Sequence, residues 1–203
     1  MNDTVRRAAL GLLLLAPTAV RAQFHEEPDL SGIGLSGQTP ESIILNWPTF
    51  SYRLSRLMLA EYGQPAEASD HRLTWVDNAP WKRTVVYRKP PKDRMLTSGA
   101  GRLEQSVAYR VPPDRLADLG RFDMDIEADK DAGRLTAISD SESENILVLN
   151  LADEVIAGRR SPASAKEFRR KQLALRDSGK TSPYLERLLF VPAGGAPDPE
   201  SPD

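Results

Sequence analysis

Hydrophobic residues recur at helical spacing between residues 48 and 62. Residues 48–62 place apolar side chains three and four positions apart, which is the spacing of one helix face: Phe50, Leu54, Leu57 and Met58. Pro48 suits a first helical turn. Gly63 fits the left-handed position beyond a helix end, and Pro65 prevents continuation. The pattern therefore predicts a helix that ends at Tyr62.

Two longer helices are predicted in the second half, each with a serine as its N-cap. Ser141 or Ser143 can cap a helix that ends at Gly158 and is apolar along most of its length, with Ile146, Leu147, Leu149, Leu151, Val155 and Ile156. Ser161 caps the next helix, and Pro162 occupies its first turn. This second helix directs Ala165 and Phe168 to the core and Arg169, Arg170 and Lys171 outward.

Short runs of β-branched, aromatic or alternating residues predict strands between these helices. The runs are 73–76, 84–87, 103–111, 124–128 and 134–139, the last two forming a hairpin around Asp131-Ala132-Gly133. A short helical turn begins at Pro113. This order predicts a single α+β domain over residues 42–190, with an antiparallel sheet of about four to five strands and helices packed mainly on one face.

The first 22 residues have the layout of a secretory signal peptide. Arg6 and Arg7 precede a short apolar run that Pro17 breaks, and small residues precede Gln23 at the expected cleavage positions. The run is shorter than the roughly 17–20 apolar residues that span a bilayer. We therefore expect cleavage after Ala22 and a periplasmic or secreted protein with no transmembrane segment after signal removal. The general secretory route is favoured, and the arginine pair leaves the twin-arginine route open.

Composition changes at both ends of the predicted domain. Residues 23–41 and residues 191–203 are rich in Gly, Pro and Ser without sustained periodicity. This composition is typical of a flexible leader and a disordered tail.

Charge and residue usage exclude several classes of function. The net charge is −2, and removal of residues 1–22 takes away three arginines and one aspartate, leaving about −4. That balance argues against a nucleic-acid or anionic-membrane surface. The chain has no cysteine and two histidines, His25 and His71. The chain therefore has too few of these residues to build a zinc site or a Cys/His or Ser/His/Asp relay. We predict no cofactor.

Two segments carry a resemblance to a known family. Residues 62–88 read YGQPAEASDHRLTWVDNAPWKRTVVYR, and residues 145–158 read NILVLNLADEVIAG. They resemble an uncharacterised family of bacterial exported proteins that pairs a YGxPxE...LxW...GPWKRTxVYR block with a NxLxLNLAxxIxxG helix. Ala79 stands where that family usually has glycine, so the turn before Pro80 is expected to differ. The resemblance spans most of residues 47–170 and implies export. No activity is known for the family, so it implies no catalytic residue.

Aromatic and cationic residues on or beside the first predicted strands form one candidate ligand or partner surface: Trp75, Trp81, Lys82, Arg83 and Arg88. These residue types suit a small anionic ligand, a carbohydrate or the carboxylates of an envelope protein. The favoured alternative is that the tryptophan packs in the core while the lysine and arginine are solvated.

Acidic residues alternate along the predicted hairpin, at Asp123, Asp125, Glu127, Asp129 and Asp131. The first three are weak candidates for a calcium site, because hard cations bind several oxygens. On an extended strand, however, neighbours on one face lie roughly 6.5–7 Å apart, too far for three to share an ion. We predict a solvated edge strand and no metal site.

The sequence as a whole favours a non-enzymatic binding or scaffolding domain. The alternative is an envelope hydrolase whose carboxylates are distant in sequence, drawn from Glu104, Asp123 or Asp125, but no spacing fixes their separation. Asn145 and Asn150 lie on the apolar helix, and we predict that they are buried and bonded to backbone.

Overall fold

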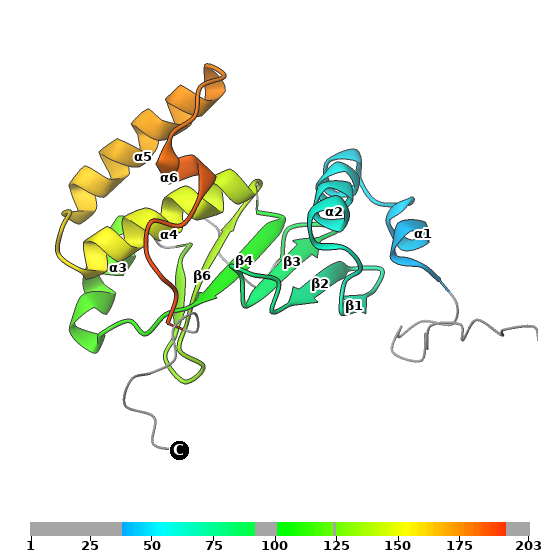
Figure 1. Cartoon of the computed structure of the whole chain (residues 1–203), viewed down its shortest axis with the longest axis horizontal. Helices are drawn as coiled ribbons and strands as arrows, with labels where there is room; N and C mark the ends of the chain where they lie inside the picture. The colour runs from blue at the N-terminus through cyan, green and yellow to red at the C-terminus, as the bar shows by residue number, and fades with distance from the viewer. Residues whose placement is uncertain (1–37, 92–100, 124, 194–203) are drawn as a thin grey trace, which may run out of the picture. The chain divides into compact units, whose positions relative to one another are not determined.

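The computed structural model describes residues 38–91, 101–123 and 125–193, and its fold is α+β as predicted (Figure 1). A six-stranded sheet has the order β1-β2-β3-β4-β6-β5, and every neighbouring pair is antiparallel. The strands are β1 Glu67–Ala68, β2 Arg72–Val76, β3 Arg83–Tyr87, β4 Leu103–Ala108, β5 Glu127–Asp129 and β6 Arg134–Ser139. The sheet is one strand larger than predicted, because the two-residue β1 carries no recognisable pattern.

Helices precede, interrupt and follow the strands. They are α1 Pro40–Ile44, α2 Thr49–Tyr62, the 3-10 turn η1 Pro113–Arg115, α3 Leu116–Phe122, α4 Glu142–Ile156, α5 Pro162–Asp177 and α6 Pro183–Glu186. Among the described residues, no helix combines the length and the apolarity needed to cross a bilayer.

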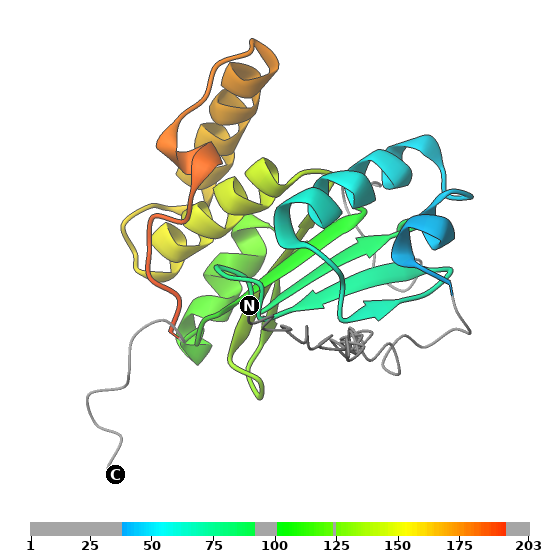
Figure 2. The same cartoon turned by 45° about the vertical axis from the view of Figure 1, so that its right-hand side comes forward.

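Two helices cover one face of the sheet, α2 over β2 and β3 and α4 over β4 and β6 (Figure 2). The strand register places on this face the buried side chains of Leu73, Trp75, Val86, Leu103, Val107, Leu135 and Ala137. They divide into one apolar cluster under α1 and α2 and a second under α4. Burial of this apolar surface is the main stabilising contribution available to a chain without disulfides.

Helix ends follow the capping residues that the sequence indicates. Gly63 follows α2 with φ +70°. The hydroxyl of Ser141 accepts from the backbone N–H of Glu144, and that of Ser161 accepts from Ser164 at the start of α5. These side chains satisfy amide donors that a helix N-terminus leaves unpaired.

The observed elements differ from the predicted ones at two places near the N-terminal side. The leader was expected to extend to residue 41, but α1 begins at Pro40, and Ile43 and Ile44 are buried. In α2, Leu57 is exposed because the buried face runs through Ser51, Leu54, Ser55 and Met58. Two serines thus form part of the buried face of α2, and a pattern of apolar residues alone does not include them.

The two helix asparagines behave as predicted. Asn145 donates to the carbonyl of Leu103 at 3.1 Å, so it ties α4 to β4. Asn150 donates to the carbonyl of Arg187 at 2.9 Å and accepts from the N–H of Leu189 at 2.7 Å. Asn150 therefore fixes the segment after α6 against α4.

The predicted signal peptide (residues 1–22), most of the predicted leader and most of the predicted tail lie outside the described residues, as does Met124 of the predicted hairpin.

Candidate functional site

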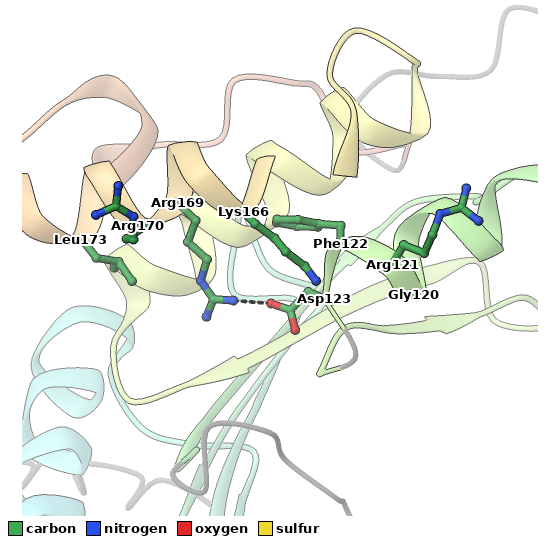
Figure 3. A pocket seen from close by; sticks show the side chains of 8 residues that line it. All are labelled: Gly120, Arg121, Phe122, Asp123, Lys166, Arg169, Arg170 and Leu173. Carbon is green, nitrogen blue, oxygen red and sulfur yellow. Dashed lines mark hydrogen bonds and ion pairs between the residues drawn. The ribbon is translucent and has the colours of Figure 1, made fainter. Parts of the chain in front are cut away.

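Helix α5 lies against α3 and α4 and buries a single residue, Ala165. Between α5 and the end of α3 is an open groove of about 720 Å³ (Figure 3). Its lining comes from two short stretches of chain more than 40 residues apart in sequence: Gly120, Arg121, Phe122, Asp123, Lys166, Arg169, Arg170 and Leu173. We call this the α3–α5 groove.

The α3–α5 groove is rich in positive charge. Four of its lining residues are cationic and one, Asp123, is anionic. Lys166 and Arg169 point towards Asp123, whereas Arg121 and Arg170 lie towards opposite ends (Figure 3). Leu173 and the alkyl stems of the long cations add apolar surface, whereas Phe122 lies beneath them and is 2% exposed. A cationic wall over an apolar floor suits an anionic ligand with an apolar part.

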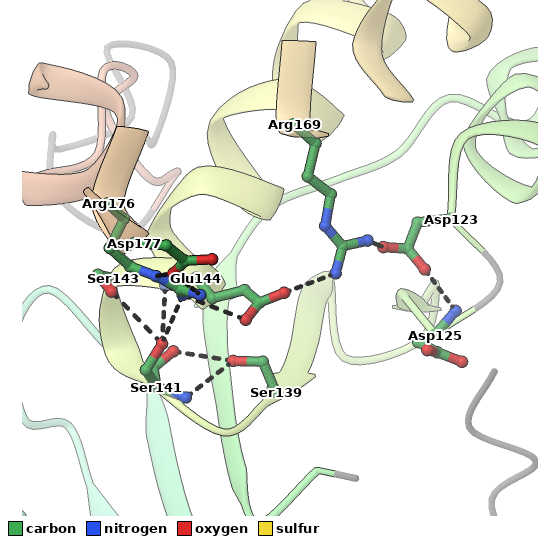
Figure 4. Close-up of polar contacts among 9 residues, drawn as sticks. All are labelled: Asp123, Asp125, Ser139, Ser141, Ser143, Glu144, Arg169, Arg176 and Asp177. Atoms are coloured by element: carbon green, nitrogen blue, oxygen red, sulfur yellow. Dashed lines mark hydrogen bonds and ion pairs between the residues drawn. The ribbon is translucent and has the colours of Figure 1, made fainter. Parts of the chain in front are cut away.

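One arginine is shared between two carboxylates from other elements (Figure 4). The guanidinium of Arg169 donates to Asp123, which follows α3, and to Glu144 in the first turn of α4, at 2.9 Å. The Arg169 side chain is 25% exposed, and the two carboxylates are 6% and 19% exposed. This contact ties three helices together through charge, and we call it the Asp123–Arg169–Glu144 bridge.

Burial dominates the electrostatics of Asp123. Loss of solvent raises the pKa of this carboxyl above its ordinary value of 3.8, and the positive charge of Arg169 opposes that rise. The backbone N–H of Asp125 also donates to it at 2.9 Å. Asp123 thus accepts from both a cation and a backbone amide.

The same bridge continues along α5. Arg176 donates to the second oxygen of Glu144 at 3.4 Å and to Ser141, the N-cap of α4, at 3.5 Å. Arg169 and Arg176 lie seven residues apart, two turns on one face of α5, which explains how both reach the start of α4.

Lys166 differs from the other cations of the groove. Arg121 pairs with Asp118, Arg169 with Asp123, and Arg170 with Glu167. Among the described residues, no carboxylate lies within ion-pair distance of the exposed Lys166 ammonium group. Lys166 is therefore the lining cation with the most charge left to offer a ligand.

The residues of the predicted ligand surface around Trp81 do not lie together in the structure. Trp81 is 1% exposed, and its indole N–H donates to Tyr62 Oη at 3.0 Å and to Glu142 at 3.2 Å. Burial and then the bond to Glu142 raise the pKa of Tyr62. Trp75 is 2% exposed and donates to the carbonyl of Gly63. Both tryptophans are core residues because each indole N–H has a partner inside the fold.

The three cations predicted with them point to separate places. Lys82 is exposed and pairs with Asp77 at 3.0 Å. Arg83 lies on the face of the sheet opposite Trp75 and contacts Glu104 at 3.6 Å. Arg88 donates to the carbonyl of Asn46, beyond α1.

The alternating acids do not form one strand face. Only Glu127 and Asp129 lie in β5, an edge strand of three residues. Asp123 ends α3 and turns into the protein, and Asp129 is bonded to Arg134 across the hairpin. In the part of the chain that is described, no three acidic or histidine side chains gather closely enough to hold a metal ion. The weak calcium candidates Asp123, Asp125 and Glu127 thus lie on different local structures.

The acids considered for a hydrolase lie on two elements, Glu104 on β4 and Asp123 with Asp125 directly after α3. Glu104 lies on the sheet, where Tyr87 donates to it at 2.8 Å. Asp123 meets a different acid, Glu144, and the Arg169 guanidinium lies between them. A carboxylate pair that acts as acid and base needs space between its members for the substrate or a water molecule, and here a cation fills that space.

No family model, no curated protein and no solved structure matches this chain. The site is therefore interpreted from its own chemistry. The basic run at residues 169–171 was predicted to be a solvated helix face, and only the fold shows that Arg169 turns inward.

Proposed function

We propose that the chain is an exported, non-enzymatic domain that binds or scaffolds a partner, and that the α3–α5 groove is its contact site. The observation that carries this proposal is the excess of cationic side chains in an open groove with an apolar floor. Its volume of about 720 Å³ lies within the range of ligand sites.

Two features of the described residues favour binding over catalysis. Arg169 bridges Asp123 and Glu144, so neither carboxylate is placed as a general base. Ser139, Ser141 and Ser143 cluster near the start of α4, and their hydroxyls bond locally to one another or to backbone at the cap. A binding role, by contrast, needs only the cationic side chains that line the groove.

Photo-crosslinking in living cells tests the contact site. A photoreactive amino acid is placed at Lys166, and as a matched control at Arg53, an exposed position on α2. We expect a specific adduct from position 166, which is lost when Arg170 is changed to Glu, and none from position 53. Equal crosslinking from the two positions would contradict a role for the groove.

Export is tested separately by sequencing the N-terminus of the protein recovered from the periplasm. We expect it to begin at Gln23. Recovery of the chain in the cytoplasm with Met1 retained would contradict export.

A further inference from the structure

We infer that the α3–α5 groove binds a short acidic segment of a partner protein in extended form, with acidic residues at alternate positions followed by an apolar residue. This inference rests on the proposed function, because it names the ligand class of the same groove. Three observations lead to it: the position of Asp123, the spacing of the cations along α5, and the apolar residue one turn further on.

The first observation excludes a compact, highly charged anion at the centre of the groove. Asp123 lies there, and its carboxylate already occupies Arg169. A phosphate dianion placed between Arg169 and Lys166 would meet that carboxylate, and like charges at short range repel. Singly charged groups spread along the wall of α5 avoid this repulsion.

The second observation sets the spacing of those groups. Lys166 and Arg170 are four residues apart on α5, so they lie one turn apart on one face. Their Cβ atoms are thus separated by roughly 5–6 Å. Alternate residues of an extended peptide lie about 6.5–7 Å apart and point to the same side. Two acidic residues separated by one residue therefore match the spacing at which the Lys166 and Arg170 side chains leave α5, and these two exposed side chains turn to meet the carboxylates.

The third observation sets the next position. Leu173 follows Arg170 by three residues and lines the groove on the same face of α5. The next side chain on the same side of an extended peptide reaches this point, where an apolar group is favoured. The expected motif is acidic-x-acidic-x-apolar, and it can run in either direction along α5.

The guanidinium group also selects carboxylates. Arg170 now pairs with Glu167 on the exposed surface, at 2.7 Å, with side chains 72% and 48% exposed. Exposed pairs contribute little, about 0–1 kcal/mol, so a ligand carboxylate can replace Glu167 as the partner. The planar fork of arginine then binds the carboxylate through two parallel hydrogen bonds.

Binding of a labelled peptide to the purified exported chain tests the inference. The probe is Ser-Glu-Ser-Glu-Ser-Leu-Ser, measured by fluorescence anisotropy at an ionic strength of about 0.15 M, where the Debye length is about 8 Å. A peptide of the same composition with its two glutamates adjacent serves as the spacing control. We expect the probe to bind about tenfold more tightly to the wild type than to Lys166→Glu/Arg170→Glu, because both contacts become repulsive.

The matched control is Arg53→Glu/Arg56→Glu on α2, which makes the same change in net charge at exposed arginines of another helix. We expect this variant to bind within about twofold of the wild type, since screening at a distance leaves local contacts dominant. If charge reversal in the groove disturbs folding by circular dichroism, Lys166→Gln/Arg170→Gln replaces it, with the same expected direction.

Three results would overturn the inference. Equal losses in the groove variant and in the α2 variant would show that net charge alone drives binding. Equal affinity for the probe and for the control peptide with adjacent glutamates would show that the alternate spacing of the acidic residues is not required. Displacement of the probe by inorganic phosphate, at concentrations at which chloride has no effect, would assign the groove to phosphate. In that last case the peptide inference fails, and crosslinking from position 166 decides the proposed function separately: an adduct with a partner would keep the groove as a contact site, and its absence would not.

Discussion

Helices α4 and α5 are neighbours in sequence and nearly equal in length, yet they are held in the fold by different forces. Helix α4 has 15 residues and buries ten of them, whereas α5 has 16 residues and buries one. The contacts of α5 with α3 and α4 include ion pairs made by Arg169 and Arg176. Apolar burial fixes α4 as part of the core, while α5 keeps most of its surface available to a ligand.

The comparison predicts unequal costs for the same substitution, Leu to Ala, on the two helices. Leu151 of α4 is fully buried, so Leu151→Ala should lower the free energy of unfolding by about 2–5 kcal/mol. Leu173 of α5 is only partly buried, so Leu173→Ala should cost less than about 1.5 kcal/mol. Urea denaturation of the two variants measures both values. Similar costs would show that α5 is held by apolar packing as α4 is.

The next largest effect is expected at the Asp123–Arg169–Glu144 bridge. Breaking a buried ion pair costs about 3–5 kcal/mol, and the partial exposure of Arg169 reduces the expected cost of Arg169→Gln to about 1–3 kcal/mol. The neighbouring control Arg170→Gln breaks only an exposed pair and should cost less than about 0.5 kcal/mol. If the two variants were equally stable, the bridge would not hold α5 in place.

A smaller, pH-dependent effect is expected from Asp123. The carboxyl has its ordinary pKa of about 3.8 in the unfolded state, and burial raises the pKa above this value in the folded state. Between the two pKa values the folded state therefore binds more protons than the unfolded state. The contribution of Asp123 to stability is therefore largest below its unfolded pKa and falls as pH rises through the folded one.

Comparison with Asp123→Asn isolates that contribution, because the variant keeps every other titrating group. The stability of the wild type relative to the variant should decrease as the pH rises above about 4, measured by urea denaturation at each pH. A relative stability that increases over this range would mean that the attraction of Arg169 outweighs burial and lowers the pKa of Asp123.

The smallest effect on stability is expected at Lys166. Lys166→Ala removes an exposed cation and should change the free energy of unfolding by less than about 0.5 kcal/mol. The same variant should weaken binding of the acidic probe about threefold, because one of the two wall contacts is lost. Unchanged affinity would remove Lys166 from the contact site.

Much of the fold could be predicted from local signals in the sequence. The glycine after α2, the serine caps of α4 and α5, and the apolar residues of α4 each act within one turn of their own position. The two-residue β1 and the short α1 could not be predicted, because tertiary contacts stabilise elements too short to form alone.

The candidate site could not be predicted in the same way. The Trp-Lys-Arg block is the most distinctive local feature, but Trp81 satisfies its N–H inside the core and the cations beside it diverge. The groove instead joins residues 120–123 to residues 166–173. Neither stretch is unusual alone, and only the packing of α5 against α3 brings their charges together.

Chemical-shift mapping tests the central claim most directly. The chain, labelled with nitrogen-15, is titrated with the Ser-Glu-Ser-Glu-Ser-Leu-Ser peptide. The largest amide shifts are predicted at Gly120, Phe122, Lys166, Arg170 and Leu173, with the amides of β2 and β3 unchanged. Shifts centred on β2 and β3, or an unchanged spectrum at saturating peptide, would contradict the assignment of the α3–α5 groove as the binding site.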